Sequence, residues 1–177
     1  MVLYHGSTTE IKEIDLTLSK PNKDFGKGFY LSNNFEQAYN MATYKAGLFG
    51  TYPLVTKFEF DENLLKNDEL NVLTFSDYSK EWTEFVFKNR NQETQDFSHN
   101  YDIVIGPIAN DKVGAQIRRF VEGDISFDTF LERLRYMKGI TFQYFFGTEK
   151  AIKMLVNKGL CNEWCWISDR MYNTRFS

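Results

Sequence analysis

Hydrophobic and polar positions alternate in short runs along this 177-residue chain, and turn residues separate the runs. Alternation with a period of two is typical of strands that bury one face. Six runs predict strands, at residues 2–6, 28–32, 54–60, 70–75, 101–108 and 140–146. The pattern therefore predicts a core rich in β-structure.

Helical periodicity occupies much of the sequence between these runs. Asn34 is expected to cap a helix over residues 35–46 that stops at Gly47, because a short polar side chain satisfies the first N–H groups and glycine often ends helices. Further helices are predicted over residues 77–90, from about Asn110, from Ser126, and from Thr148 to about Lys158. Strands and helices do not alternate regularly, so the predicted class is α+β rather than a doubly wound parallel sheet.

The length fits a single domain over residues 1–177, in which residues 160–177 form a C-terminal extension without clear periodicity. The formal net charge of −3, with basic residues scattered among acidic ones, argues against an extended nucleic-acid surface. The sequence has no long apolar stretch and no signal-peptide pattern. We therefore expect a cytoplasmic location without membrane contact. Cys161 and Cys165 have no second cysteine pair and no adjacent histidine, so no metal site is expected.

Two glycines surround a lysine in the segment "DFGKGFYLS", residues 24–32. A phosphate-binding P-loop needs Ser or Thr after the lysine and then a helix, whereas Lys27 is followed by Gly28 and a predicted strand. A dinucleotide-binding fingerprint needs a third glycine at position 31, which is Leu31. The segment by itself therefore favours a turn that leads into a strand.

A second candidate feature is "LYHGS", residues 3–7, in which His5 precedes Gly6 in a predicted strand. Gly6 has no side chain to keep a ligand from the backbone. A lone histidine in a strand is more often a hydrogen-bonded structural residue than a catalyst. The other histidine, His99, lies in a polar loop and is expected at the surface.

The block "YHGS" followed by "GKGFYLS" resembles the first two elements of the ADP-ribosyltransferase fold, in the branch of poly(ADP-ribose) polymerases and diphtheria toxin. Three longer blocks, at residues 21–32, 101–113 and 143–152, more closely resemble a bacterial family, domain of unknown function 3990. The resemblance implies a split β-sheet core with flanking helices and NAD as co-substrate. It also implies a bacterial toxin or regulatory modifier, with a small neutralising antitoxin protein as a partner.

The resemblance further implies which residues act. The implied catalytic residues are His5, Tyr30, Gln143 and Glu149, and the implied NAD-binding residues are His5, Gly6, Ser7, Gly28, Tyr30, Tyr39 and Arg90. His5 would bond a ribose hydroxyl and the Gly6 backbone would hold the nicotinamide amide. Tyr30 and Tyr39 would cover the two faces of the nicotinamide ring, because electron-rich rings attract a cation. Arg90 would meet the diphosphate, although a cationic cap at a helix end is an equal reading.

The third signature position departs from the pattern, because Gln143 stands where the related enzymes carry a glutamate. Glutamine keeps an acceptor oxygen but loses the negative charge. Glu149 is the substitute candidate, although the first turn of a helix capped by Thr148 explains it equally well. The expected function is an NAD-dependent mono-ADP-ribosyltransferase acting on a protein rather than a nucleic acid. The alternative is a catalytically weak module that binds NAD or ADP-ribose.

Overall fold

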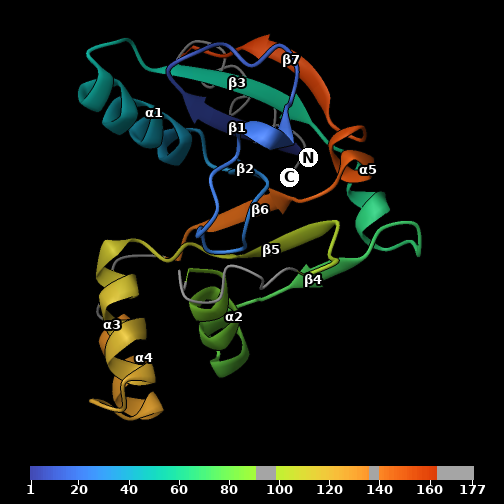
Figure 1. Ribbon diagram of the computed structural model, residues 1–177. Helices are drawn as coiled ribbons and strands as arrows, with labels where there is room; N and C mark the ends of the chain where they lie inside the picture. Colours follow the sequence, from blue (N-terminus) through green and yellow to red (C-terminus); the bar gives the residue numbers. More distant parts are fainter. Residues whose placement is uncertain (91–98, 136–139, 163–177) are drawn as a thin grey trace, which may run out of the picture.

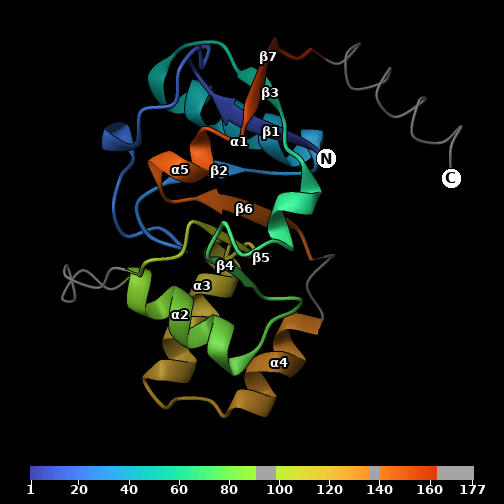
Figure 2. The same cartoon turned by 90° about the vertical axis from the view of Figure 1, so that its right-hand side faces the viewer.

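The computed structural model describes residues 1–90, 99–135 and 140–162, which form two small β-sheets with helices on their outer sides (Figures 1 and 2). Sheet A has the strand order β1-β3-β7, with β1 at Val2–Ser7, β3 at Leu54–Glu59 and β7 at Val156–Leu160. Sheet B has the order β2-β6-β5-β4, with β2 at Phe29–Leu31, β6 at Phe142–Phe146, β5 at Ile103–Pro107 and β4 at Val72–Thr74. Neighbouring strands are antiparallel except β4 and β5. The predicted α+β class is confirmed.

Helices cover the outer faces of both sheets (Figure 1). The α-helices are α1 at Phe35–Phe49, α2 at Lys80–Arg90, α3 at Asp111–Val121, α4 at Phe127–Arg135 and the short α5 at Glu149–Ile152. Two 3₁₀ turns, η1 at Leu16–Leu18 and η2 at Glu62–Leu65, were not predicted. Within the described residues, no helix has the length and apolar character needed to cross a membrane.

Three apolar clusters follow this layered arrangement. The central cluster lies between the sheets and includes Leu3, Phe58, Ile103 and Phe146. Another cluster joins sheet B to α2, α3 and α4, and includes Trp82, Val104, Val113, Phe130 and Phe145. The smallest joins sheet A to α1 and includes Tyr4, Phe35, Ala38, Ala42 and Val55. Strands β1, β2 and β6 each contribute residues to two of these clusters, which fixes the positions of the strands that carry the candidate residues.

All six predicted strands are present, and Asn34 caps α1 as predicted, because its side chain accepts from the backbone N–H of Gln37. Two helix ends differ from the prediction. The helix α1 passes Gly47 and ends at Phe49, where Gly50 adopts a left-handed conformation with φ of 64°. The helix predicted from Thr148 to Lys158 stops at Ile152, and β7 follows it.

The predicted C-terminal extension begins inside the fold. Leu160 is the last residue of β7, and the buried Cys161 donates its backbone N–H to Val55 O at 2.8 Å. Sheet A therefore continues through the residues that were assigned to an extension. The rest of that extension, from residue 163 onward and including Cys165, lies outside the described residues.

Candidate functional site

Sheets A and B meet at an isolated bridge, where the backbones of Tyr4 and Ser32 exchange hydrogen bonds of 2.7 and 2.9 Å. At His5, the residue after Tyr4 in β1, the Nδ1 atom lies 2.7 Å from the carbonyl oxygen of Tyr30. The His5 ring thus contacts β2 where the backbones no longer pair. We call the place where β1 and β2 diverge, marked by His5, Gly6 and Tyr30, the β1–β2 wedge.

His5 is held as a neutral acceptor at this wedge. Burial, assisted by the nearby Lys45 and Lys23 ammonium groups, lowers its pKa from 6.5 to about 4, although the bond to Tyr30 opposes the shift. A carbonyl oxygen only accepts, so Nδ1–H donates to it and Nε2 carries the lone pair. The ring stacks on Phe29 at 4.5 Å between centroids. Among the described residues Nε2 has no partner, so it is free to accept from a ligand hydroxyl.

Gly6 is required by the packing of α1. A Cβ atom at this position would lie 1.9 Å from Ala38 O, so its bare face is covered by the helix and not, as predicted, left open for a ligand. The polar groups of Gly6 point away from β3, because Tyr4, two residues earlier, uses its own groups on Ser32. The carbonyl of Gly6 accepts from Lys45 Nζ at 2.8 Å. Its backbone therefore lies on the β2 side of β1, and the predicted contact with a nicotinamide amide stays a prediction.

The Tyr30 side chain is anchored in the loop that precedes it. Its hydroxyl donates to Gly26 O at 2.7 Å and accepts from Phe25 N at 3.0 Å. Burial raises the pKa of this phenol well above its ordinary value, so it stays protonated. The ammonium group of Lys23 lies 4.8 Å from the ring centroid. One face of the ring is therefore in contact with a lysine of the same chain, and the predicted contact with a nicotinamide ring stays a prediction.

Gln143 lies on β6, next to β2, so His5, Tyr30 and Gln143 come from three neighbouring strands. The side-chain amide of Gln143 is buried and donates from Nε2 to Asp24 Oδ2 at 2.6 Å. This bond, with a longer one from Nε2 to Pro107 O at 3.5 Å, engages the amide nitrogen, whereas the oxygen Oε1 has no hydrogen bond among the described residues. No contact joins the His5 ring to Gln143 in the described parts of the chain.

Asp24 is a buried carboxylate that sequence reasoning missed. Its Oδ1 accepts from Arg90 Nε at 2.7 Å, and its Oδ2 accepts from the backbone N–H of Ala109 at 2.8 Å as well as from Gln143. Arg90 also bonds Ala109 O. The predicted role of Arg90 at a diphosphate is therefore wrong for this structure, because its guanidinium neutralises Asp24 inside the fold.

Ser7 and Gly28 have structural surroundings. The Ser7 hydroxyl donates to Thr9 O, and the backbone N–H of Gly28 donates to Ser19 Oγ at 3.0 Å. A Cβ atom on Gly28 would lie 2.2 Å from the Phe145 ring, so this position packs against sheet B. Neither residue directs a free polar side chain into the wedge.

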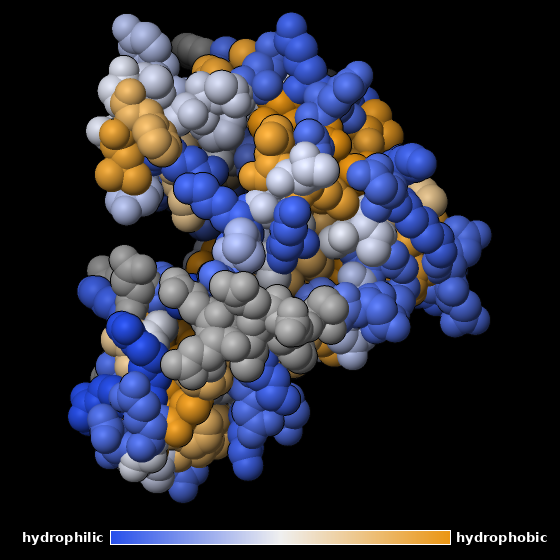
Figure 3. Space-filling model, in the orientation of Figure 1, coloured by the Kyte–Doolittle hydropathy of each residue, from blue (hydrophilic) through white to orange (hydrophobic). Residues whose placement is uncertain are grey.

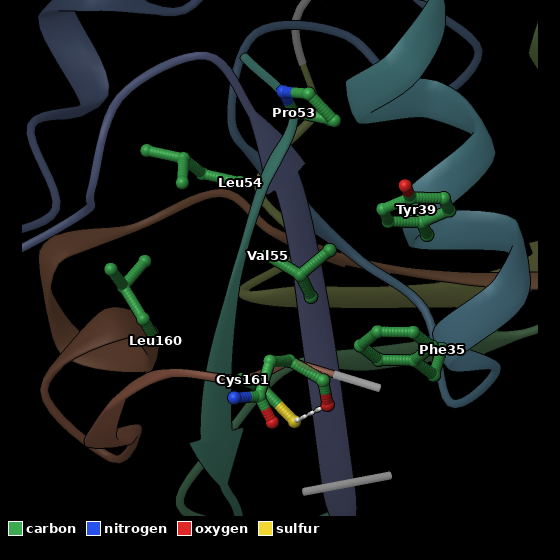
Figure 4. A pocket seen from close by; sticks show the side chains of 8 residues that line it. Phe35, Tyr39, Pro53, Leu54, Val55, Leu160 and Cys161 are labelled. Carbon is green, nitrogen blue, oxygen red and sulfur yellow. Dashed lines mark hydrogen bonds between the residues drawn. The ribbon is translucent and has the colours of Figure 1, made fainter. Parts of the chain in front are cut away.

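Tyr39 lies apart from Tyr30, which corrects the predicted two-ring sandwich. Its ring stacks on Phe35, with 6.0 Å between centroids, and lines a pocket of about 470 Å³ between α1 and the β3 and β7 strands (Figure 4). The other lining residues are Pro53, Leu54, Val55, Leu160, Cys161 and Asn162. None of the lining residues is charged, so this pocket lacks the cationic side chain that would neutralise a diphosphate.

Glu149 occupies the first position of α5, where Thr148 caps the helix by accepting from Ala151 N at 3.2 Å. The Glu149 side chain is exposed and lies beyond the end of β6 that is remote from Gln143. A carboxylate in the first helical turn stabilises the helix dipole. The geometry thus supports the capping alternative for Glu149.

His99 is half-buried and hydrogen-bonded on both ring nitrogens, whereas a plain surface position was predicted. Its Nε2 lies 2.9 Å from Phe25 O and its Nδ1 accepts from Tyr101 N, so it is the Nε2–H tautomer. The ring packs against Phe85, Tyr101 and Phe145. The two histidines therefore carry their protons on opposite ring nitrogens, and His5 alone presents a free acceptor.

The sequence held one usable signal for the missed residues. Lys45 shares the inward face of α1 with Ala38 and Ala42, and a charged residue on such a stripe needs an explanation. Asp24 gave no comparable signal, because aspartate is common in turns.

Comparisons with known proteins agree with one of the two resemblances. Among curated proteins, none matches the chain. A family that covers both the wedge and most of the two sheets does match, over residues 1–156. The chain therefore belongs to the family described as "Protein of unknown function (DUF3990)".

Proposed function

We propose that the chain is an NAD-dependent mono-ADP-ribosyltransferase with an ADP-ribosyltransferase-like split core. The observation that carries the proposal is the β1–β2 wedge, where a neutral His5 with a free Nε2 acceptor lies beside the Gly6 backbone. Two sheets that join through an isolated bridge and then separate agree with a split sheet. Figure 3 shows the surface hollowed between the part that carries α1 and the part that carries α3 and α4.

The residues at the wedge suit the nicotinamide riboside half of NAD. His5 Nε2 would accept from a ribose hydroxyl, and the Gly6 N–H would donate to the carboxamide oxygen. The Tyr30 ring would cover the positively charged pyridinium, in the place that Lys23 takes in the described structure. Tyr39, Arg90 and Glu149 have no part in this arrangement.

In the proposed reaction, the bond between ribose C1′ and the nicotinamide nitrogen breaks, and its electron pair leaves with neutral nicotinamide. An acceptor nucleophile then attacks C1′ and loses a proton to solvent. Positive charge develops on the sugar in between, and nearby oxygen atoms stabilise it. Gln143 Oε1 would accept from a ribose hydroxyl, and its bond to Asp24 strengthens it as an acceptor.

A second candidate function is a module that binds NAD or ADP-ribose without efficient turnover. Gln143 favours it, because a neutral amide supplies less stabilisation to a developing cation than a carboxylate does. The Asp24 charge is neutralised by Arg90 and does not replace the missing one. Both candidates use the same wedge and differ in the rate of bond cleavage.

The proposal includes a cytoplasmic protein acceptor and, if the activity is toxic, a small neutralising protein. The test is incubation of the chain and cell lysate with NAD labelled in the adenylate, followed by counting of protein and nucleic-acid fractions. Label in protein, lost in His5→Ala, is the expected result. Binding of NAD with no label in either fraction selects the binding module. Absence of both binding and transfer contradicts the proposal.

A further inference from the structure

Two partly buried lysines flank the wedge without any acidic partner. Lys45 lies on the inward face of α1 and donates to Gly6 O at 2.8 Å, and Lys23 lies over the Tyr30 ring. The ion pairs given by the described residues are Met1–Glu62, Arg90–Asp24 and Lys158–Glu59, so neither lysine takes part in one. Each ammonium group therefore keeps unused N–H donors.

Both charges are unfavourable where they lie. Burial lowers the pKa of Lys45, and the charge of Lys23 lowers it further. Burial likewise lowers the pKa of Lys23, with a smaller effect from Lys20. His5 feels both lysines, so the three groups lie close enough to interact. A partly buried cation without an anion costs stability, and a bound anion would remove that cost.

We infer that Lys23 and Lys45 form an anion site that binds the phosphate groups of a nucleotide ligand at the mouth of the β1–β2 wedge. The inference rests on the proposed function, since NAD carries a diphosphate. It also replaces Arg90, whose guanidinium is committed to Asp24. Ammonium groups suit this role because each binds phosphate as a point charge through several donors.

The site also predicts a movement of one side chain. Lys23 covers the ring face that a pyridinium would need, so the two cations cannot occupy it together. Rotation of Lys23 toward the phosphates would free the ring and pair the ammonium in one step. The phosphate and ring subsites are then coupled, because removal of the Lys23 ammonium group would weaken the phosphate contact and at the same time free the Tyr30 ring face.

The test uses the full chain and inorganic pyrophosphate, NAD and nicotinamide riboside as calorimetric probes. The variants Lys23→Met and Lys45→Met are compared with Lys27→Met, which removes an exposed lysine of the same loop. We expect roughly tenfold weaker pyrophosphate binding by Lys23→Met and Lys45→Met, roughly tenfold weaker NAD binding by Lys45→Met, and no change for Lys27→Met. Nicotinamide riboside, which has no phosphate, should bind Lys45→Met as it binds the native chain.

Stability provides an independent measurement on the same variants. We expect the midpoint of urea unfolding for Lys45→Met to equal or exceed the native value, because the variant no longer buries an unpaired cation. If Lys45 instead stabilised the fold, the midpoint of this variant would be lower. Native-like pyrophosphate and NAD binding by both variants would overturn the inference and leave the proposed function standing. Pyrophosphate binding that depends on the lysines, without any NAD binding, would support the anion site and contradict the proposed function.

Discussion

At His5, burial beside two lysines determines the protonation state of the imidazole. The lowered pKa keeps the imidazole neutral near pH 7, and the Tyr30 carbonyl selects the tautomer with Nε2 as acceptor. A charged imidazolium would present a second N–H donor instead and would repel a pyridinium. The residue is therefore prepared to bind a hydroxyl and not to act as an acid at neutral pH.

The stability of the fold should report this neutral state. The unfolded chain takes up a proton at His5 below about pH 6.5, whereas the folded chain does so only below about 4, so stability falls as the pH drops through that window. We expect His5→Gln to remove up to about 3 kcal/mol of this loss. Urea unfolding of both proteins between pH 4 and 7 is the measurement. His99, whose pKa is lowered by burial, and Asp15 and Glu81, whose pKa values are lowered by hydrogen bonds, contribute to the slope that remains.

Equal slopes for the native chain and His5→Gln would show that His5 is charged or exposed in the folded state. A parallel His99→Gln variant serves as control, because it removes the other buried imidazole while leaving the wedge intact. Each variant should remove its own part of the slope.

Gln143 is restrained by Asp24, and this restraint predicts how the position responds to charge. Replacing Gln143 with Glu would place a carboxylate where Nε2 now lies 2.6 Å from Asp24 Oδ2. We expect Gln143→Glu to lose about 2–4 kcal/mol of folding free energy at pH 7. The loss should shrink toward pH 5, because the pKa of the new carboxyl is raised in the folded state and protonation relieves the repulsion.

The uncharged variant Gln143→Met separates this repulsion from loss of the hydrogen bond. Its cost should be independent of pH, because it adds no titrating group. If Gln143→Glu is as stable as Gln143→Met throughout pH 5 to 8, then Asp24 does not hold this side chain.

At the scale of elements, α1 is fixed on sheet A by the absence of a side chain at Gly6. We expect Gly6→Ala to cost about 3 kcal/mol, because its Cβ would lie 1.9 Å from Ala38 O and force the helix away from β1. Gly47→Ala, within α1 and with no atom within 4 Å of its added Cβ, should instead stabilise by about 0.5–1 kcal/mol. Denaturant unfolding of the pair tests the packing. Similar effects of the two changes would contradict it.

The sequence predicted the elements that local chemistry determines and failed where distant residues decide. Alternation and capping residues predicted six strands and the start of α1. β7 was missed because most of its side chains are exposed, so no alternation marks it, and its pairing with β3 comes from the fold. Thr148 does cap a helix, but a cap carries no information on where that helix ends.

The candidate site was predictable in its strands but not in its side-chain partners. His5, Tyr30 and Gln143 lie on neighbouring strands, as expected from the order of the blocks. The engagement of Arg90 by Asp24 joins residues 66 positions apart and could not be inferred from either neighbourhood. Tyr39 was misplaced because helical periodicity gives the face of a helix but not the object it faces.

At the scale of the molecule, three layers of apolar packing hold two sheets that separate beside a bridge. The histidine and the backbone groups of the wedge are positioned by strands that contribute residues to the apolar clusters. Its two lysines lie on long side chains, one bonded to Gly6 O and one over the Tyr30 ring. We propose that NAD binds with its riboside at the strands and its diphosphate at these lysines.

The most direct test is an NMR titration of the chain labelled with ¹⁵N-histidine, since the chain contains only two histidines. Without ligand, we expect two neutral rings of opposite tautomer, with His5 protonated on Nδ1 and His99 on Nε2. Saturating NAD should shift the unprotonated Nε2 signal of His5, as a ribose hydroxyl donates to it, and leave His99 unchanged. Unchanged signals from both rings, or a shift confined to His99, would contradict the placement of NAD in the β1–β2 wedge.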